Sequence, residues 1–551
     1  MENTEYKAQK NTALFPIVIA VVLIGGIYLG NRMSSNSDNS VTSSGAIQTE
    51  TANPKKLVHI INYIEQNYVD SVNKADLIND AIVDILKDLD PHSGYSSPEQ
   101  TKSSQEQLQG SFYGIGIEFM ILRDSLVVID PIPNGPSIKA GLKPGDRIIA
   151  VDGMSITGDT LTNALIMSKL KGKYDTEVKL TVKRNSEGKT LPFTITRGNI
   201  PVESVATDFL IDSNTGYVKV IRFARQTGQE FEEALSRLAK KGATQFIVDL
   251  RGNPGGYLTQ AIALSEEFLE KSDLIVFTEG THQGKKSDYA KRTGRYHDFP
   301  VSILIDQGSA SASEIVAGAL QDHDRGLIVG RRSFGKGLVQ NELELSDLSS
   351  IRLTIARYYT PSGRCIQKPY GEDIAYEEDY FERYESGELF SQDSIALTDT
   401  VKYYTTGKRV VYGGGGITPD IFIPLDTTYS VSLLNEISFE NLIRQYAFDY
   451  ADKNRPEVSY NYNDALKFSK TFSLSSTEWN EFLELVTSTE IEYTEEEMAQ
   501  TTEELKKRIS AQIGKYIFGD EAFYRTSFKT DQVVLSALEN INRDLKTISS
   551  K

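Results

Sequence analysis

The sequence lacks the residues from which disulfides and cysteine-built metal sites are made. Cys365 is the single cysteine among 551 residues, so no internal disulfide and no metal site made of several cysteines can form. Positive charge is also scarce, because 59 lysines and arginines face 76 aspartates and glutamates, giving a formal net charge of −17. A nucleic acid would be repelled by the whole surface, so we exclude nucleic acid as a partner.

Histidine, the usual base of serine hydrolases, is scarce as well. The sequence has five histidines: His59, His92, His282, His297 and His323. The first four fall in a helical segment, a proline-containing turn and a polar loop, where we expect surface or capping residues. His323 follows the helix that begins near Ser311, and it is the one histidine that remains a serious candidate for a base.

An apolar run near the N-terminus, from Ala13 to Gly30, predicts a membrane-spanning helix. Eighteen residues at about 1.5 Å each cover roughly 27 Å, close to the thickness of the hydrocarbon layer. No Ala-x-Ala cleavage site follows the run, so we expect a retained anchor, with a cleaved signal as the alternative. Either interpretation places the bulk of the chain outside the cytoplasm, in the periplasm or an equivalent compartment.

Changes of composition along the chain predict several folded units, for which its 39% apolar content supplies enough hydrophobic residues. The expected segments are a tail at 1–12, the anchor at 13–30, a flexible polar tether at 31–53, a helical unit at 54–108, a β-rich module at 109–200, an α/β core with a mixed sheet at 201–425, and a helical extension at 426–551. The residues of the last segment do not indicate its role.

Apolar periodicity predicts the main elements of the two central segments. The expected strands are 126–129, 147–151, 178–182, 217–221, 246–250 and 301–305. Helices are expected at 161–170, after Gly256, at 315–320, and where Phe231, Ala234, Leu235 and Leu238 share one face. Alternating strands and helices after Gly216 indicate an α/β core.

The β-rich module opens with a glycine-rich turn that runs into a strand. Gly114, Ile115, Gly116 and Ile117 can turn successive amides toward one point, which suits the terminal carboxylate of a bound peptide. A tight turn in a β-domain is the structural alternative for the same residues. The later stretch 140–148, Ala-Gly-Leu-Lys-Pro-Gly-Asp-Arg-Ile, resembles the PDZ domain pattern and favours the peptide groove.

A lysine can replace histidine as the base if burial lowers its pKa. A free lysine with a pKa near 10.4 is neutral in only about one molecule in a thousand at pH 7.4. Lys336 lies among small and apolar neighbours in the stretch 333–339, unlike the lysines of polar loops. Ser311 lies where a strand gives way to a helix, with alanines on both sides that leave room for a substrate.

The same two regions offer donors for an oxyanion. The amide of Ala312 lies at the positive end of a helix, and a glycine turn at the end of a buried strand supplies Gly255 and Gly256 as candidates for the second donor.

Three other motifs compete with this interpretation. Residues 330–336 match the start of a phosphate-binding loop, but Gly337 stands where Ser or Thr is needed and a strand is expected to follow. Residues 168–171 fit Ser-x-x-Lys, but they fall within the helix of the β-rich module without the companion motifs. The glycine run 413–416 is expected to be a hinge or turn.

With these motifs together, the chain resembles the carboxyl-terminal processing peptidases, also called tail-specific proteases. The resemblance spans roughly 58–425 and rests on six stretches besides the PDZ-like module: 89–95, 249–256, 309–319, 333–340, 358–364 and 416–420. It implies an α/β protease core with an inserted PDZ-like domain, an N-terminal helical unit and a C-terminal helical extension.

The resemblance also implies roles for particular residues. Ser311 is the expected nucleophile, Lys336 the base and Gln340 the residue that orients the lysine, whereas Ser309 and Ser313 become loop and helix-cap residues. The implied reaction is acyl-enzyme proteolysis without metal, nucleotide or other cofactor.

The implied substrates are unfolded or loosely tailed proteins, bound through their free C-termini by the PDZ-like groove. An adaptor protein and a homo-oligomer are compatible with the family, and nothing in the residues fixes either. The competing hypothesis is a catalytically inactive PDZ scaffold at the membrane.

Overall fold

The computed structural model describes residues 55–158, 161–184, 188–371, 376–543 and 545, which divide at Ile78 into two compact units. The first unit contains α2 (Lys55–Asn67) and the first residues of α3 (Lys74–Lys87). Within this unit Lys74 Nζ donates to Asn62 Oδ1 at 2.7 Å and to Glu65 Oε2 at 2.8 Å, which ties the two helices together.

The predicted tail, anchor and tether, at 1–12, 13–30 and 31–53, lie outside the described residues. Within the described residues no helix combines the length and the apolar character that crossing a membrane requires.

The second unit, from Asn79 onward, is built around a six-stranded sheet with the strand order β10-β11-β12-β15-β16-β21. Its strands are β10 (Val205–Leu210), β11 (Thr215–Val220), β12 (Gln245–Asp249), β15 (Val301–Ile305), β16 (Leu327–Gly330) and β21 (Ile421–Phe422). All neighbours are parallel except β10 and β11. The three strands β11, β12 and β15 are buried along their whole length, as expected of parallel strands covered on both faces.

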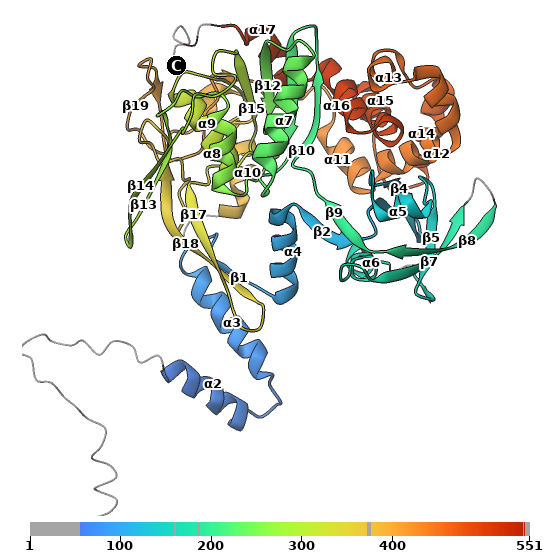
Figure 1. Cartoon of the computed structure of the whole chain (residues 1–551), viewed down its shortest axis with the longest axis horizontal. Coiled ribbons are helices and arrows are strands. Elements are labelled where there is room, and N and C mark those ends of the chain that lie inside the picture. The colour runs from blue at the N-terminus through green and yellow to red at the C-terminus, as the bar shows by residue number, and fades with distance from the viewer. Residues whose placement is uncertain (1–54, 159–160, 185–187, 372–375, 544, 546–551) are drawn as a thin grey trace, which may run out of the picture. The chain divides into compact units, whose positions relative to one another are not determined.

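Helices cover both faces of this sheet, as Figure 1 shows. The first face packs against α7 (Thr227–Lys240), α8 (Leu258–Glu266) and α9 (Ala312–Asp322), and the second against α16 (Asp520–Ser527), η4 (Phe528–Thr530) and α17 (Gln532–Asn540). Successive side chains of a strand point to opposite faces of the sheet, so Val218 packs in the core on the first face and Tyr217 in the core on the second. The predicted inner face of α7 is confirmed by four fully buried side chains: Phe231, Ala234, Leu235 and Leu238.

A second, antiparallel sheet stands beside the first and carries part of the site. Its strands are β1 (Gly94–Ser96), β13 (Leu274–Gly280), β14 (Gln283–Tyr289), β17 (Leu338–Glu344) and β18 (Ser350–Tyr359). The register of β17 on β18 shifts between Val339 and Gln340, which marks a β-bulge. Six further elements complete the core: α4 (Pro98–Gln109), η2 (Tyr376–Glu378), α10 (Asp379–Glu385), η3 (Gln392–Ser394), β19 (Tyr403–Tyr404) and β20 (Val410–Val411).

The β-rich module has the predicted strands and helix. It contains β2 (Ser111–Gly114), β3 (Ile117–Leu122), β4 (Ser125–Pro131), α5 (Pro136–Ala140), β5 (Arg147–Val151), β6 (Met154–Ser155), α6 (Asn163–Leu170), β7 (Glu177–Arg184), β8 (Lys189–Thr196) and β9 (Gly198–Pro201). Its helix begins at Asn163 rather than at Leu161, because Thr162 caps it by accepting from the Leu165 amide. The strand order β3-β4-β5-β7-β8 leaves β3 at an edge.

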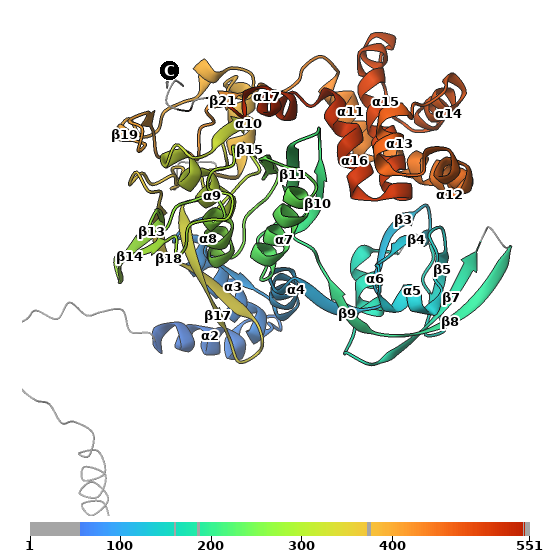
Figure 2. The same ribbon diagram turned by 45° about the horizontal axis from the view of Figure 1, so that its top comes forward.

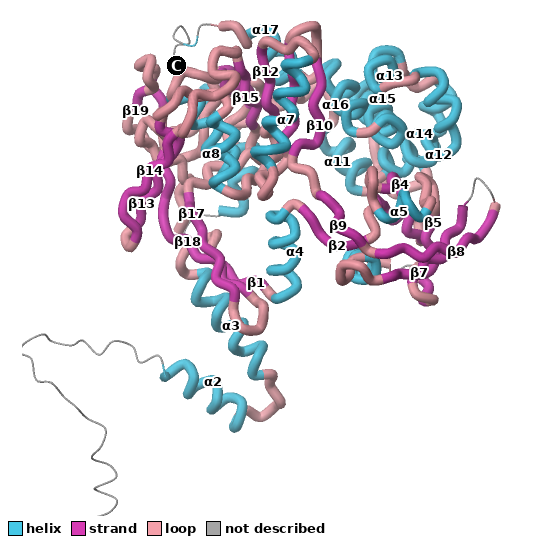
Figure 3. The backbone as a smooth tube through the Cα atoms, in the orientation of Figure 1, coloured by secondary structure: helices cyan, strands magenta, loops and turns pink. Residues whose placement is uncertain are grey.

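The predicted C-terminal extension is helical in its described residues, as Figure 3 shows. Before α16 it consists of α11 (Val431–Phe439), α12 (Leu442–Tyr462), α13 (Ala465–Thr471), α14 (Ser476–Thr487) and α15 (Glu495–Phe518). Figures 1 and 2 show these helices beside the strands β3 and β4.

Alternating residues of β4 explain this packing. Val127 and Ile129 join the core of the helical region, whereas Leu126 and Val128 join the core of the β-rich module. Two ion pairs flank the contact, Arg123 to Asp449 at 3.1 Å and Lys515 to Glu118 at 3.4 Å. The hairpin β3–β4 is therefore packed on both faces.

Replacement of Phe528 by alanine tests the second face of the central sheet. Phe528 is 8% exposed and its ring lies 4.5 Å from that of Tyr217, so Phe528→Ala should lower the free energy of unfolding by about 3 kcal/mol or more. Phe439→Ala, at a side chain that is 84% exposed, is the matched control and should change it by less than about 0.5 kcal/mol. Denaturant unfolding followed by fluorescence makes the comparison, and equal effects of the two variants would contradict the assigned core.

Candidate active site

Ser311 occupies a strained turn between β15 and α9. Its backbone has φ 55° and ψ −110°, which side chains other than glycine rarely adopt. The turn places Ser311 at the N-cap of an 11-residue helix, half-buried between the buried residues Ala310 and Ala312. Such strain persists only where the surroundings impose it, and here the neighbouring hydrogen bonds do so.

The carboxylate of Glu314 is the first of these constraints. Its Oε2 accepts from the amides of Ser311 at 2.8 Å and Lys336 at 2.9 Å. Its Oε1 accepts from the amide of Gly335 at 2.7 Å and the hydroxyl of Ser333 at 2.6 Å. Burial raises the pKa of Glu314 to about 7, although its four donors favour the charged form. One fully buried side chain thus joins the segments that carry the candidate nucleophile and base.

The hydroxyl of Tyr358 joins the same two segments from the carbonyl side. It donates to the carbonyl of Lys336 at 2.6 Å and lies 3.2 Å from that of Ser311. Tyr358 is 1% exposed, and burial raises its pKa well above the usual value. The phenol therefore stays protonated and remains a donor.

The ammonium of Lys336 lies in the environment that a lysine base requires. Lys336 Nζ donates to Gln340 Oε1 at 3.0 Å. Burial lowers the pKa of Lys336, and the positive charge of Arg352 on β18 lowers it further, while Glu314 and Asp90 oppose the shift. A larger fraction of Lys336 is therefore neutral near pH 7 than of a lysine in water.

A backbone carbonyl fixes the orientation of Gln340. The β-bulge before Gln340 re-aims its side chain, whose Nε2 donates to the carbonyl of His92 at 2.5 Å, leaving Oε1 to face Lys336. Asp90 holds the turn that presents this carbonyl, since its Oδ1 accepts from the amide of His92 at 2.8 Å and from Thr354 Oγ1 at 3.1 Å.

The prediction of a surface or capping role for His92 is therefore wrong. Its ring packs edge-on against Tyr376 with centroids 5.2 Å apart, and its Nε2 lies 2.8 Å from the Tyr376 hydroxyl. Burial, with Lys336 nearby, lowers the pKa of His92 to about 4, so this imidazole stays neutral near pH 7. The sequence could have indicated this position of His92 only through the stretch 89–95, to which His92 belongs.

The glycine turn lies directly against the Ser311 turn. The amide of Ala310 donates to the carbonyl of Asn253 at 3.0 Å, and Ser313 Oγ donates to the same carbonyl at 2.9 Å. A Cβ at Gly255 would lie 2.9 Å from the amide nitrogen of Ala312, which shows how closely the turns approach. Ser313 therefore fastens the glycine turn from within the first turn of α9, rather than capping the helix as predicted.

The two predicted glycine donors differ in their hydrogen bonding. The amide of Gly255 donates to Asn253 Oδ1 at 2.9 Å, whereas no hydrogen bond among the described residues uses the amide of Gly256. A Cβ at Gly256 would lie 2.1 Å from the carbonyl oxygen of Phe223, so only glycine fits there.

A cavity of about 820 Å³ brings the predicted residues of the core together. Its lining includes six of them: Ser311, Ala312, Lys336, Gln340, Gly255 and Gly256. His323 is not among the lining residues. It lies at the other end of α9, roughly 16 Å away for 11 residues of helix, where its Nε2 lies 2.7 Å from the carbonyl of Leu274.

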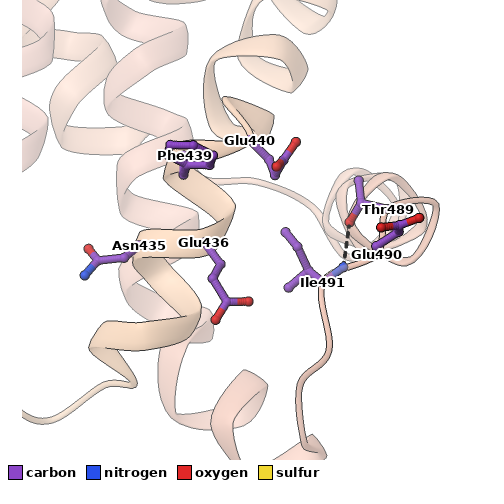
Figure 4. Close-up of a pocket in the computed structure, with 7 residues that line it drawn as sticks. All are labelled: Asn435, Glu436, Phe439, Glu440, Thr489, Glu490 and Ile491. Carbon is purple, nitrogen blue, oxygen red and sulfur yellow. Dashed lines mark hydrogen bonds between the residues drawn. The ribbon is translucent and has the colours of Figure 1, made fainter.

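A second cavity, of about 710 Å³, lies on the helical region and is drawn in Figure 4. Glu436 and Phe439 of α11 face Ile491 across it. Its lining holds carboxylates but no lysine or histidine to serve as a base. The cavity around Ser311 is therefore the better candidate for hydrolytic chemistry.

The residues predicted to bind a peptide do not line this cavity and belong to the β-rich module. Ile115 and Gly116 connect β2 to the edge strand β3, and Gly116 has a φ of 74°, within the left-handed region. No hydrogen bond of the described residues uses the amide of Ile115 or Gly116, so both remain able to donate to a carboxylate. Ile117 begins β3, whose free edge can pair with an extended peptide.

Three sequence families match separate parts of the chain. The profile of peptidase family S41 matches residues 214–376, and the profile of the PDZ domain matches 114–195. Residues 433–519 match a family of unknown function, DUF8443, which covers most of the helical region before α16.

Known proteins are similar over a larger part of the chain. The carboxy-terminal-processing protease of Bartonella bacilliformis is 34% identical over 419 residues, which cover 75% of this chain and 93% of that protein. The carboxy-terminal processing protease CtpB of Bacillus subtilis is 33% identical over 365 residues, covering 64% and 75%. Among solved structures, the photosystem II D1 C-terminal processing protease has 28% identity, a TM-score of 0.32, and coverage of 56% of this chain and 88% of that one.

The raised pKa of Glu314 predicts a pH dependence of stability that Glu314→Gln should remove. The folded protein binds this proton more tightly than the unfolded chain, whose glutamate pKa is about 4.5. The stabilisation that comes from protonated Glu314 is thus complete below pH 4.5 and is lost as the pH rises through about 7. The free energy of unfolding falls by about 3 kcal/mol over this range.

Unfolding measured by denaturant from pH 4.5 to 8 gives the comparison. The stability of the unmodified protein should fall relative to that of Glu314→Gln across this window, whereas the exposed Glu436→Gln should follow the unmodified protein. Parallel curves for all three proteins would contradict the assigned titration.

Proposed function

The chain belongs to peptidase family S41, the carboxy-terminal processing proteases, and from this premise we propose that Ser311 is its nucleophile and Lys336 its general base. The observation that carries the proposal is the pair of side chains, Glu314 and Tyr358, that hold the Ser311 and Lys336 segments at one cavity. The enzyme is then a serine endopeptidase with a Ser/Lys dyad.

The first half of the reaction makes an acyl-enzyme. Neutral Lys336 Nζ accepts the proton of Ser311 Oγ as that oxygen forms a bond to the carbonyl carbon of the scissile peptide. The carbonyl electron pair moves onto the carbonyl oxygen, and when it returns the C–N bond breaks and Lys336 gives its proton to the leaving amine. Gln340 Oε1 holds the ammonium and amine forms of Lys336 in one place.

The same groups serve the second half. Lys336 takes a proton from a water molecule, whose oxygen forms a bond to the acyl carbon. The bond between that carbon and Ser311 Oγ then breaks, Lys336 returns the proton to Ser311 Oγ, and the new C-terminus is released. In both halves the negative charge on the carbonyl oxygen is stabilised by the amide of Ala312, at the N-terminus of α9, and by a glycine amide. In this conformation Gly256 is better placed for that role than Gly255, whose amide Asn253 already engages.

The PDZ domain selects the substrate in this proposal. The amides of the turn 114–117 bind the terminal carboxylate, and the peptide adds to the free edge of β3 beside α6. Ile115 and Ile117 belong to the apolar side of this groove, which favours an apolar last residue. Loosely folded proteins with an accessible tail are the expected substrates.

We also propose that residues 13–30 anchor the enzyme in a membrane, with the protease outside the cytoplasm. The apolar run and its flanking basic residues support this location. An adaptor protein and a homo-oligomer are compatible with the proposal. Recovery of the protein in the membrane fraction after an alkaline wash tests the anchor, and recovery in the soluble fraction would contradict it.

Substitution of either member of the dyad should abolish proteolysis. An unfolded protein with an apolar free C-terminus is the substrate, and its C-terminally amidated twin tests recognition by the PDZ domain. Ser311→Ala and Lys336→Ala should each lower the cleavage rate by about 10³-fold or more, because neither residue acts without the other. Amidation should slow cleavage by the unmodified enzyme.

Matched variants keep this experiment decisive. Lys286→Ala removes an exposed lysine of β14 and should leave the rate unchanged. Activity that survives Lys336→Ala and is lost in His323→Ala would overturn the lysine mechanism. A folded, unmodified protein that cleaves no substrate of this kind would favour the inactive scaffold instead.

A further inference from the structure

The glycine turn begins at a charged cluster at the carboxyl end of β12. Asp249, only 1% exposed, accepts from the hydroxyl of Tyr217 at 2.8 Å and from Lys219 Nζ at 3.0 Å. Arg251, the first residue of the turn, donates to Asp249 through its guanidinium at 2.6 Å and through its backbone amide at 2.9 Å. The start of the turn is thus anchored to one buried carboxylate.

Arg251 has a second carboxylate partner, which comes from 280 residues further along the chain. Its Nη1 lies 2.9 Å from Asp531 Oδ2 and 3.1 Å from Asp531 Oδ1. Each of the two side chains is 19% exposed, so the pair is well shielded from solvent. Asp531 immediately precedes α17, which packs against the second face of the central sheet through Val533, Val534 and Ala537.

The charges of the cluster balance only when Asp531 is counted. Lys219 and Arg251 supply two positive charges, and Asp249 supplies one negative charge. Asp531 supplies the second. The nearby Arg331 and Asp306 carry one charge of each sign, so loss of the Asp531 charge would leave a net positive charge beside the turn.

The far end of the same turn meets Ser311. Gly252 donates its amide to Asp306 Oδ1 at 2.8 Å, and the carbonyl of Asn253 accepts from Ala310 and Ser313. Four residues after Arg251, a Cβ at Gly255 would lie 2.8 Å from Ser311 Cβ. Arg251 is thus separated from the candidate oxyanion donors Gly255 and Gly256 only by a short turn, which is hydrogen-bonded at Gly252, Asn253 and Gly255.

We infer that Asp531 is a positioning residue for catalysis, which makes the C-terminal segment 520–543 part of the active-site support. Asp531 holds Arg251 against Asp249, and Arg251 sets where the glycine turn presents its amide. The inference rests on the proposed function, because it needs the glycine turn to supply an oxyanion donor. It assigns a catalytic consequence to a segment outside the matched protease and PDZ regions.

The variant Asp531→Asn separates this role from the stability of α17. Asp531 Oδ1 caps the helix by accepting from the amides of Val533 at 3.0 Å and Val534 at 3.3 Å, and asparagine caps helices as well as aspartate does. Asp531→Asn therefore keeps the cap and removes the charge that Arg251 requires. Asp531→Ser, which also caps, serves as the second variant should the first fail to fold.

The expected result is a loss of turnover without a loss of binding. In the full-length enzyme, kcat should fall about 10-fold, less than the 10² to 10³ that removal of a whole oxyanion donor costs, with KM unchanged. The loss should be equal for the free and the amidated C-terminus, because Asp531 acts after substrate recognition.

Arg525→Gln is the matched control. Arg525 attaches the same segment to the sheet elsewhere, where its Nη1 donates to the carbonyl of Leu210 at 3.0 Å. This variant should lower the melting temperature and leave kcat unchanged. Wild-type kcat in both Asp531 variants, or a kcat that falls with the melting temperature alike in Arg525→Gln and Asp531→Asn, would overturn the inference.

Ser311→Ala, measured beside these variants, distinguishes failure of the proposed function from failure of the positioning role. Full activity in Ser311→Ala would contradict the proposed function itself. Activity that depends on Ser311 but not on Asp531 would contradict only the positioning role.

Discussion

The active site depends on two side chains that bridge the same pair of segments. Glu314 accepts from the amides of Ser311 and Lys336, and the hydroxyl of Tyr358 contacts their carbonyls. These four contacts hold the Ser311 turn in its left-handed conformation and fix the start of β17 beside it. The proposed reaction needs the amine of Lys336 close to Ser311, and Glu314 and Tyr358 hold the backbones of these two residues together.

The remaining structure can be understood as support for this junction. The bulge in β17 and the carbonyl of His92 turn Gln340 toward Lys336, and Ser313 fastens the glycine turn to α9. The C-terminal helices contact both functional parts of the chain, the hairpin β3–β4 of the PDZ domain and the second face of the central sheet. Among the described residues, none of this helical region lines the cavity around Ser311, so the region reaches the site only through these contacts.

The sequence predicted the features that depend on local patterns of residues. The buried strands of the central sheet, the apolar face of α7, and the placement of Ser311 and Lys336 at one cavity all follow from local apolar runs and small flanking residues. The family resemblance added Gln340. The catalytic roles of these residues stay predictions, as do the domain limits and the anchor at 13–30.

What the sequence could not predict depends on backbone groups and distant partners. A carbonyl such as that of His92 accepts a hydrogen bond whatever its side chain is, so no residue type announces it. Glu314 looks like an ordinary residue of a helical first turn, and its burial becomes visible only when the 333–336 segment folds over it. Asp531 meets Arg251 across 280 residues, beyond the reach of any local pattern.

The pH dependence of nucleophilic attack by Ser311 tests the central claim most directly. A fluorophosphonate reacts with the serine oxygen at phosphorus with loss of fluoride, and the mass of the intact protein measures this phosphonylation. The account predicts a rate that rises with pH with an apparent pKa below the 10.5 of a free lysine, since only neutral Lys336 accepts the proton, and predicts that Lys336→Ala loses this rise. The same rise in Lys336→Ala, or its loss in His323→Ala, would contradict the account.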